Sequence, residues 1–144
     1  MLGLDVGEAR IGVASGRLGS PLSFGRGAIK REGTRRDVAT VAALARDEGA
    51  ATVVVGLPLR LDGGDSEQTG RVRAFALALQ HELSSTGIAV VLEDERLTTQ
   101  AAKRQIGGGP LPRGRRQEKG RLDEAAAVMI LESYLSRLAK AAES

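Results

Sequence analysis

Short apolar stretches over the opening segment of the chain have the period-two pattern of β-strands. The pattern predicts strands at Leu2–Val6, Ile11–Ala14 and about Ser23–Arg31, with a turn at Gly7–Arg10 between the first two. The third stretch is rich in glycine, which weakens a strand. Because short connections join these stretches, we expect the three strands to pair antiparallel.

Beyond the third strand the apolar period changes to that of helices. Thr34 followed by Asp37 resembles a capping box, and the helix that it starts is expected to end at Gly49. The run "ATVVVGLP" predicts a strand that is buried on both faces. Ser66 is then the expected N-cap of a second helix. That helix carries apolar residues at helical spacing, namely Val72, Phe75, Ala76, Leu79 and Leu83.

The C-terminal third predicts one more strand and two more helices. The strand is "IAVVLED", and the helices are expected at about Thr98–Ile106 and at Leu122 to about Ala142. Between the helices, residues 107–120 are rich in Gly, Pro and Arg and predict a flexible basic loop. The order β-β-β-α-β-α-β-α-α predicts an α/β fold. Its mixed five-stranded sheet has three antiparallel strands and then two parallel ones, with helices on both faces.

The composition agrees with a single domain over residues 1–144. Apolar residues make up 42% and charged residues 27%, as in ordinary globular domains. No apolar run approaches the roughly 20 residues that span a bilayer, and no signal segment is recognisable, so we expect no membrane partner and a cytoplasmic location. The absence of cysteine excludes disulfides and thiolate metal sites.

Positive charge is concentrated in one stretch, residues 103–121, which we call the basic segment. It contains a single acid, Glu118. Its basic residues are Lys103, Arg104, Arg113, Arg115, Arg116, Lys119 and Arg121. A cationic arm of this kind attracts a nucleic-acid backbone without reading its bases. The alternative is an ordinary solvated loop.

Four acids lie where predicted elements begin or end. Asp5 closes the first strand, Asp94 and Glu95 follow the last strand, and Asp123 opens the final helix. In a sheet of this order, the first turn of the final helix can approach the strand ends. Carboxylates gathered there without lysine would repel one another unless a cation were bound. Hard oxygen ligands suit Mg²⁺ or Mn²⁺, and two such ions can promote hydrolysis of a phosphodiester.

Taken singly, these residues have ordinary explanations. Asp5 could form a turn, Asp123 could answer a helix dipole, and Arg96 could pair with Asp94 or Glu93. Only their joint arrangement favours a site. Between the two acids after the last strand, Glu95 is favoured over Asp94 because that strand lies one position outward, about 4.8 Å further from Asp5, and Glu is longer. Asp94 remains the alternative acid.

Four motifs carry a family resemblance. The stretches "GLDVGEARIGVAS", "VVVGLPLRLDG", "EDERLTTQAA" and "LDEAAAVMILESYL" together resemble the YqgF/RuvX family, whose members are ribonuclease H-like and similar to Holliday junction resolvases. The resemblance covers almost the whole chain. It implies a metal-dependent nuclease that acts in 5′-end processing of pre-16S ribosomal RNA. By resemblance, Asp5, the Asp94/Glu95 tip and Asp123 correspond to the catalytic acids.

The chain departs from the family pattern close to Asp5, the acid of the first motif. Glu8 and Ala9 stand where the family usually has Thr-Lys, so we expect an additional carboxylate near the site. Such a carboxylate would alter the grip on a substrate.

Several functions stay open at the level of the sequence. The main alternatives are a DNA nuclease of the Holliday junction resolvase type and a non-catalytic RNA-binding factor in ribosome assembly. A sugar-kinase or actin-like nucleotide binder is disfavoured, because those proteins need two such domains. The expected partners are RNA or single-stranded or branched DNA, together with pre-ribosomal particles. We expect a monomer or a weak homodimer.

Overall fold

The computed structural model describes residues 1–20, 22–98 and 116–143, the last range by its backbone alone up to residue 119. Five strands, three helices and one short 3-10 helix, η1, lie in these ranges. Their bounds are β1 Leu2–Val6, β2 Arg10–Gly16, β3 Ser23–Lys30, α1 Thr34–Asp47, β4 Thr52–Leu57, α2 Glu67–Glu82, β5 Ala89–Asp94, η1 Glu95–Leu97 and α4 Arg116–Glu143.

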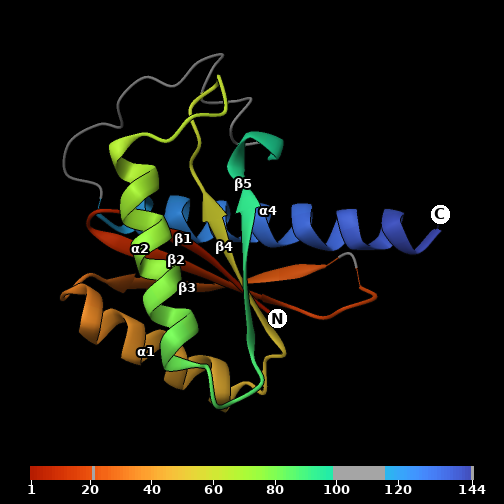
Figure 1. Cartoon of the computed structure of the whole chain (residues 1–144), viewed down its shortest axis with the longest axis horizontal. Coiled ribbons are helices and arrows are strands. Elements are labelled where there is room, and N and C mark those ends of the chain that lie inside the picture. The colour runs from red at the N-terminus through yellow and green to blue at the C-terminus, as the bar shows by residue number, and fades with distance from the viewer. Residues whose placement is uncertain (21, 99–115, 144) are drawn as a thin grey trace.

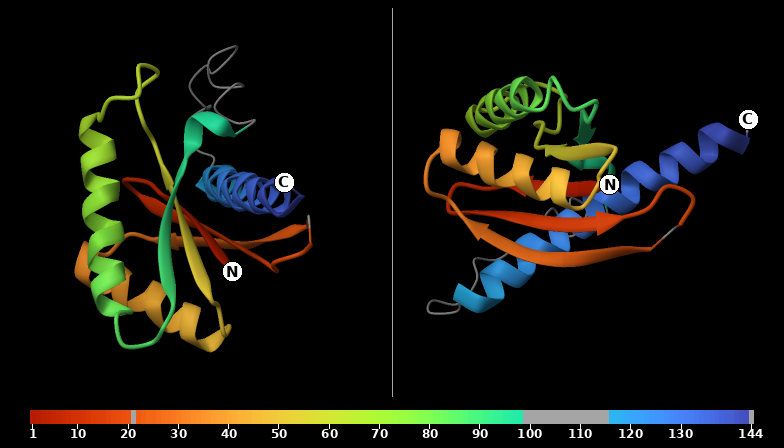
Figure 2. Two further views of the ribbon diagram at one scale, coloured as in Figure 1. Left: turned by 45° about the vertical axis from the view of Figure 1, so that its right-hand side comes forward. Right: turned by 90° about the horizontal axis from the view of Figure 1, so that it is seen from below.

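The strands form one mixed sheet in the order β3-β2-β1-β4-β5. β1 pairs antiparallel with β2 and parallel with β4, so it is the central strand. α1 and α2 cover one face of the sheet, and α4 crosses the other face (Figures 1 and 2). This arrangement confirms the predicted α/β fold with helices on both faces.

The face under α1 and α2 is built from large aliphatic side chains. Leu2, Leu4 and Val6 alternate along β1 toward this face and are buried. They pack with buried residues of the two helices, including Phe75 and Leu79. This is the period-two alternation that the sequence pattern predicts for a half-buried strand.

On the face under α4, the sheet contributes mainly small residues, and Ile130, Leu131 and Leu135 of α4 pack on it in a second, smaller hydrophobic cluster. A Cβ added at Gly3 would lie 2.8 Å from Leu131 Cβ, and one added at Gly12 would lie 1.9 Å from the carbonyl oxygen of Asp123. Both distances are shorter than real Cβ contacts. On the helix, Ala126 and Ala127 are buried. α4 can therefore lie directly on β1 and β2.

The end of α1 and the cap of α2 follow the prediction, but the start of α1 does not. Ser66 caps α2 in a capping box with Thr69. The capping box predicted at Thr34 is wrong, because Gly33 is the N-cap and makes no side-chain cap bond. Asp37 is instead buried and bonded to Arg31 Nε at 2.6 Å. The carboxylate serves a buried ion pair rather than a helix end.

The last helix begins earlier than predicted. α4 starts at Arg116, so residues 116–120 of the expected basic loop are helical. The stretch after Pro112 contains no further proline, and Arg, Gln, Glu and Lys favour helix, which explains the longer helix. Thr98 is not helical, and the rest of the helix predicted at Thr98–Ile106 and of the loop lies outside the described residues. In the described ranges, no helix is long and apolar enough to cross a bilayer.

Candidate active site

Asp5 lies on the α4 face of the central strand. Its partner on β2 is Gly12. Gly12 faces α4, because a Cβ there would meet Asp123. Directly opposed residues of antiparallel strands share a face, so Asp5 also faces α4. It is half-buried, between Leu4 and Val6, which face the opposite core.

Glu95 reaches back over the strand beside Asp5. It is the first residue of η1, directly after β5. A Cβ at Gly56 would lie 2.8 Å from Glu95 Oε1 and 2.4 Å from Ile130 Cδ1, so the carboxylate sits in space that any side chain at position 56 would fill. Val55 pairs with Leu4, and the next positions along these strands are Gly56 and Asp5. Glycine on the intervening strand therefore gives Glu95 the reach toward Asp5.

Asp94, the alternative acid, is used differently. Its carboxylate accepts from the backbone N–H of Arg96 at 2.9 Å and from the Arg96 guanidinium at 2.7 Å. This hydrogen bonding to Arg96 holds the pKa of Asp94 below its usual value. Asp94 thus caps η1, and the pairing of Arg96 with Asp94 that the sequence left open is present.

Asp123 is a residue of α4 that lies over Gly12 of β2, well inside the helix. The sequence pattern predicted that Asp123 opens the final helix, and this is wrong. Because α4 begins at Arg116, Asp123 lies about two turns inside it. A helix dipole acts over the first turn and cannot explain an acid there. The Asp123 carboxylate accepts from Arg10 Nε at 2.8 Å, and both side chains are about one-quarter exposed, 25% and 26%.

Glu124, the residue after Asp123, fixes this part of α4 against β3. Glu124 accepts a hydrogen bond from the backbone N–H of Gly27, and a Cβ at Gly25 would lie 2.3 Å from the Glu124 carboxyl carbon. The glycines of β3, which weakened the strand prediction, thus admit a carboxylate from α4. This contact fixes the position of Asp123 over β2.

The candidate acids share a face without forming a ready-made cluster. Asp5 lies on β1 and Glu95 directly follows β5, with Gly56 of β4 between them, whereas the carboxylate of Asp123 is ion-paired with Arg10. Within the part of the chain that the structure describes, no three Asp, Glu, His or Cys side chains stand together in a group that could hold a metal ion. The donor chemistry at Asp5 and Glu95 still suits a hard divalent cation, because both are carboxylates beside the cleared space at Gly56.

Glu93 is a further acid on this face. It is Gly56's partner in β5 and is 1% exposed. Ser133 Oγ donates to its carboxylate at 2.8 Å, and Arg137 forms an ion pair with it. The hydrogen bond that Arg137 donates to Glu93 raises the pKa of Arg137. Glu93 therefore ties β5 to α4 in the region next to Glu95.

Sequence reasoning missed the roles of Glu93, Gly12 and Gly56. For the glycines a signal was present, because a lone glycine inside an apolar strand marks a close approach of another group. For Glu93 the strand pattern gave none, since its partners lie 40 and 44 residues away on α4.

Glu8 does not add a carboxylate to the acids, contrary to expectation. Its side chain is exposed and pairs with Arg71 of α2 at 2.8 Å. α2 covers the opposite face of the sheet from α4 (Figure 2). The replacement of the family's Thr-Lys by Glu8-Ala9 thus changes the surface beside α2.

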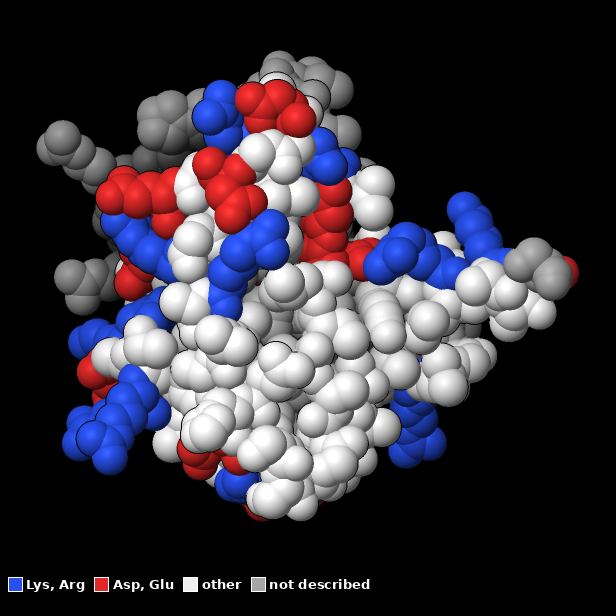
Figure 3. All heavy atoms as spheres, viewed as in Figure 1, with Lys and Arg blue, Asp and Glu red and all other residues white. Residues whose placement is uncertain are grey.

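The basic segment falls only partly within the described residues. Lys103, Arg104, Arg113 and Arg115 lie outside the described residues. The backbones of Arg116 and Lys119 belong to α4, and Arg121 is exposed on it. On the face shown in Figure 3, acidic and basic side chains crowd the end at which β4 and β5 terminate, and the lower part is largely uncharged.

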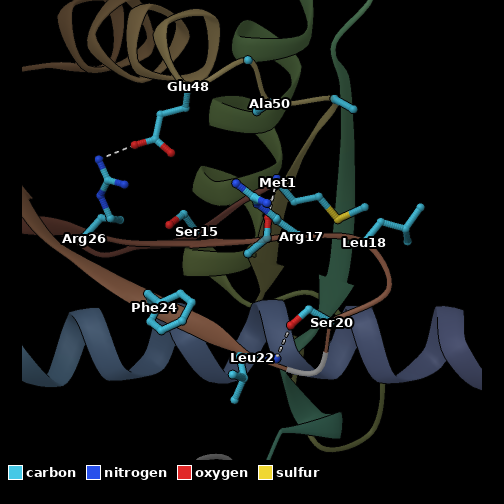
Figure 4. A pocket seen from close by; sticks show the side chains of 13 residues that line it. Met1, Ser15, Arg17, Leu18, Ser20, Leu22, Phe24, Arg26, Glu48 and Ala50 are labelled. Atoms are coloured by element: carbon cyan, nitrogen blue, oxygen red, sulfur yellow. Dashed lines mark hydrogen bonds and ion pairs between the residues drawn. The ribbon is translucent and has the colours of Figure 1, made fainter.

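A pocket of about 660 Å³ lies away from the candidate acids, at the opposite end of β1. The β2–β3 hairpin and the segment after α1 enclose it, and an ion pair between Arg26 and Glu48 spans part of its wall (Figure 4). None of Asp5, Glu95 and Asp123 lines it. Its position argues against a part in the chemistry of those acids.

Comparison with known proteins places these observations in context. A family model described as "RuvX: Holliday junction resolvase" matches residues 1–137. A Thermus thermophilus protein named "Putative pre-16S rRNA nuclease" is 46% identical, over 93% of this chain and 95% of that protein. "Ribonuclease YqgF" of Deinococcus radiodurans is 41% identical, over 95% of this chain and 88% of that protein.

A solved structure shows the same fold. It is Thermus thermophilus RuvC in complex with Holliday junction substrate, with a TM-score of 0.56 and 18% sequence identity. The match covers 96% of this chain and 94% of that chain. At this identity the likeness concerns the fold alone.

Proposed function

The chain belongs to the RuvX family, and from that premise we propose that it is a metal-dependent nuclease that hydrolyses phosphodiester bonds in the 5′-end processing of pre-16S ribosomal RNA. The names of its relatives support the activity and the RNA substrate. The observation that carries the proposal is the placement of the Glu95 carboxylate over Gly56, beside Asp5 on the central strand.

Asp5, Glu95 and Asp123 are the proposed catalytic and metal-binding residues, with Mg²⁺ or Mn²⁺ and two ions. Divalent ions at such carboxylates activate the attacking water and stabilise the leaving oxygen. Asp5 suits this role because a central strand, paired on both sides, holds a ligand rigidly. Glu95 suits it because Gly56 leaves its carboxylate room. Asp123 lies on the same face and would have to exchange its partner Arg10 for the ion.

Substrate binding is proposed for the basic segment. Its residues would neutralise phosphates without reading bases, so binding should depend steeply on salt. We expect the change of Arg113, Arg115 and Arg116 to Ala to weaken RNA binding broadly and to flatten the plot of log affinity against log salt, with an unchanged melting temperature. An unchanged slope would mean that these arginines do not contact phosphate.

The experiment that tests the proposed function compares two substrates. Purified protein is incubated with an RNA that carries the pre-16S 5′ leader and with a four-way DNA junction, in Mg²⁺ or Mn²⁺ and in chelator. We expect metal-dependent cleavage of the RNA, and loss of it in Asp5→Asn. Cleavage of the junction alone would favour the DNA nuclease, which the family description supports. Tight RNA binding without cleavage in either metal would favour a non-catalytic assembly factor.

The setting of the reaction is part of the same proposal. Pre-ribosomal particles in the cytoplasm are the proposed partner, because relatives are named for pre-16S ribosomal RNA. The proposed acting form is a monomer or a weak homodimer. Sedimentation with and without the RNA would measure it, and a stable dimer would contradict it.

A further inference from the structure

Arg10 is the cation that pairs with the candidate acid Asp123. It opens β2 two positions before Gly12, and its side chain lies on the α4 face, where Nε donates to Asp123. Among the described residues, no partner bonds to its two Nη groups. One edge of the guanidinium therefore holds Asp123, and no residue in the described ranges is bonded to the other.

Neighbouring arginines are engaged elsewhere. Arg31 is bound to the buried Asp37 and to the carbonyl of Gly7 and stacks over the ring of Phe75 at 5.6 Å. Its role is to join β3, the β1–β2 turn and the α1/α2 core. Arg71 pairs with Glu8 on the α2 side. Arg10 alone among these three faces the acids.

Pairing with Arg10 conflicts with a ligand role for Asp123. A guanidinium keeps its charge at any physiological pH, so the pair cannot be relieved by deprotonation. A divalent ion can bind Asp123 only if Arg10 withdraws. The released guanidinium would then stand beside the acids with a planar set of N–H donors, which fits two oxygens of a phosphate.

We propose that Arg10 is a residue of the site that binds a phosphate of the substrate, and that its ion pair with Asp123 keeps it from doing so until the divalent ion is bound. Before the divalent ion binds, Arg10 neutralises Asp123. When Asp123 binds the ion, Arg10 turns its guanidinium to a non-bridging oxygen of the nucleic-acid backbone at the point of cleavage. This inference rests on the proposed nuclease function and deepens it by assigning a residue to the substrate phosphate.

Two opposite effects follow for Arg10→Met. Binding of Mn²⁺ should tighten about two- to fivefold, because a competing partner of a partly exposed carboxylate is removed. Cleavage at saturating Mn²⁺ should fall about 10- to 100-fold, because a charge-assisted bond to phosphate is lost. A residue that merely supports the fold would weaken both metal binding and cleavage.

Arg10→Lys separates charge from shape. Lysine can still neutralise Asp123, so Mn²⁺ affinity should stay close to that of the parent. Cleavage should remain at least severalfold lower, because an ammonium does not present the planar pair of donors. Arg71→Met is the matched control, since it removes a similar ion pair on the α2 side, and both its Mn²⁺ affinity and its cleavage should equal the parent's.

The experiment titrates Mn²⁺ by calorimetry into the parent, Arg10→Met, Arg10→Lys, Arg71→Met and Asp5→Asn, and measures cleavage of the leader RNA at saturating Mn²⁺. Tighter Mn²⁺ binding with slower cleavage in Arg10→Met supports the inference. Weaker or equal binding, or cleavage at the parent's rate, overturns it. If Arg10→Met does not fold, Arg10→Lys decides, and the parent's rate of cleavage there overturns it. Equal Mn²⁺ binding by the parent and Asp5→Asn would instead refute the proposed function itself.

Discussion

The two faces of one sheet differ in what they bury. Toward α1 and α2, β1 presents Leu2, Leu4 and Val6 to a continuous aliphatic core. Toward α4, the same strand presents Gly3 and Asp5. Successive residues of a strand point to opposite faces, so one short strand supplies both surfaces. The difference shows how a small domain can keep a stable core and still hold carboxylates at a rigid, partly exposed position.

The α4 face buries a smaller apolar cluster around Ile130 and Leu131, and adds to it close backbone contact and ion pairs. Glycine at positions 3, 12 and 56 lets α4 and Glu95 approach the strands. Among the described residues, two ion pairs then join the helix to the sheet, Arg10–Asp123 and Glu93–Arg137. The first is partly exposed and lies beside the candidate acids, whereas in the second the carboxylate is 1% exposed. We infer that the Glu93–Arg137 ion pair, with its buried carboxylate, is structural and that the partly exposed Arg10–Asp123 ion pair is functional.

The largest effect on stability is expected when the Glu93–Arg137 ion pair is removed. Arg137→Met should lower the free energy of unfolding by about 3–5 kcal/mol, because it leaves the Glu93 carboxylate buried without its cation. Glu93→Gln should cost clearly less, because the side chain of Arg137 is 55% exposed and can turn to water. Urea unfolding of both variants measures this asymmetry. Equal losses would mean that Glu93 is not buried in solution.

A truncation in the aliphatic core should separate stability from activity. Leu4→Ala is expected to lower the free energy of unfolding by about 2–5 kcal/mol through the cavity that it leaves. At a temperature where the variant is still folded, cleavage per folded molecule should stay close to that of the parent. If cleavage were lost in fully folded protein, the two faces would not be independent.

A methyl group added on the α4 face should, unlike the truncation in the aliphatic core, strongly reduce cleavage. Gly12→Ala is expected to cost about 1–3 kcal/mol and to reduce cleavage strongly, because its Cβ would displace the backbone of Asp123. Gly70→Ala is the matched control. No atom lies within 4 Å of a Cβ there, and alanine favours the interior of α2, so it should stabilise by about 0.5–1 kcal/mol. Thermal melts and cleavage assays of both compare the positions. Wild-type cleavage by Gly12→Ala would contradict the close approach.

The smallest effect is expected at Asp94. Its lowered pKa means that the ionised carboxylate stabilises the fold above the ordinary pKa of 3.8, and this contribution is lost as the pH falls through the lower folded-state value. Asp94→Asn should therefore cost about 1 kcal/mol or less near neutral pH and flatten stability in the acid range, while cleavage is retained. A loss of cleavage as large as that of Glu95→Gln would make Asp94 the ligand.

The sequence predicted best what depends on near neighbours. The bounds of β1, the Ser66 cap and the order of the described strands and helices follow from period, β-branched runs and turn residues close in the chain. It predicted poorly what depends on where α4 crosses the sheet. The ion pair of Asp123 with Arg10 joins residues 113 apart, and the use of Gly12 and Gly56 depends on the same crossing. Such contacts leave little trace in local pattern.

The proposal that Asp5 binds a divalent ion beside Glu95 is tested most directly by thermal melts of the parent and Asp5→Asn, each in chelator and in excess Mn²⁺. In chelator, we expect Asp5→Asn to be as stable as the parent or slightly more stable, because a repulsion between neighbouring carboxylates is relieved. Mn²⁺ should raise the melting temperature of the parent by mass action and do less for the variant. If Asp5→Asn were clearly less stable in chelator and Mn²⁺ shifted both proteins equally, Asp5 would be a structural residue and the account of the site would be wrong.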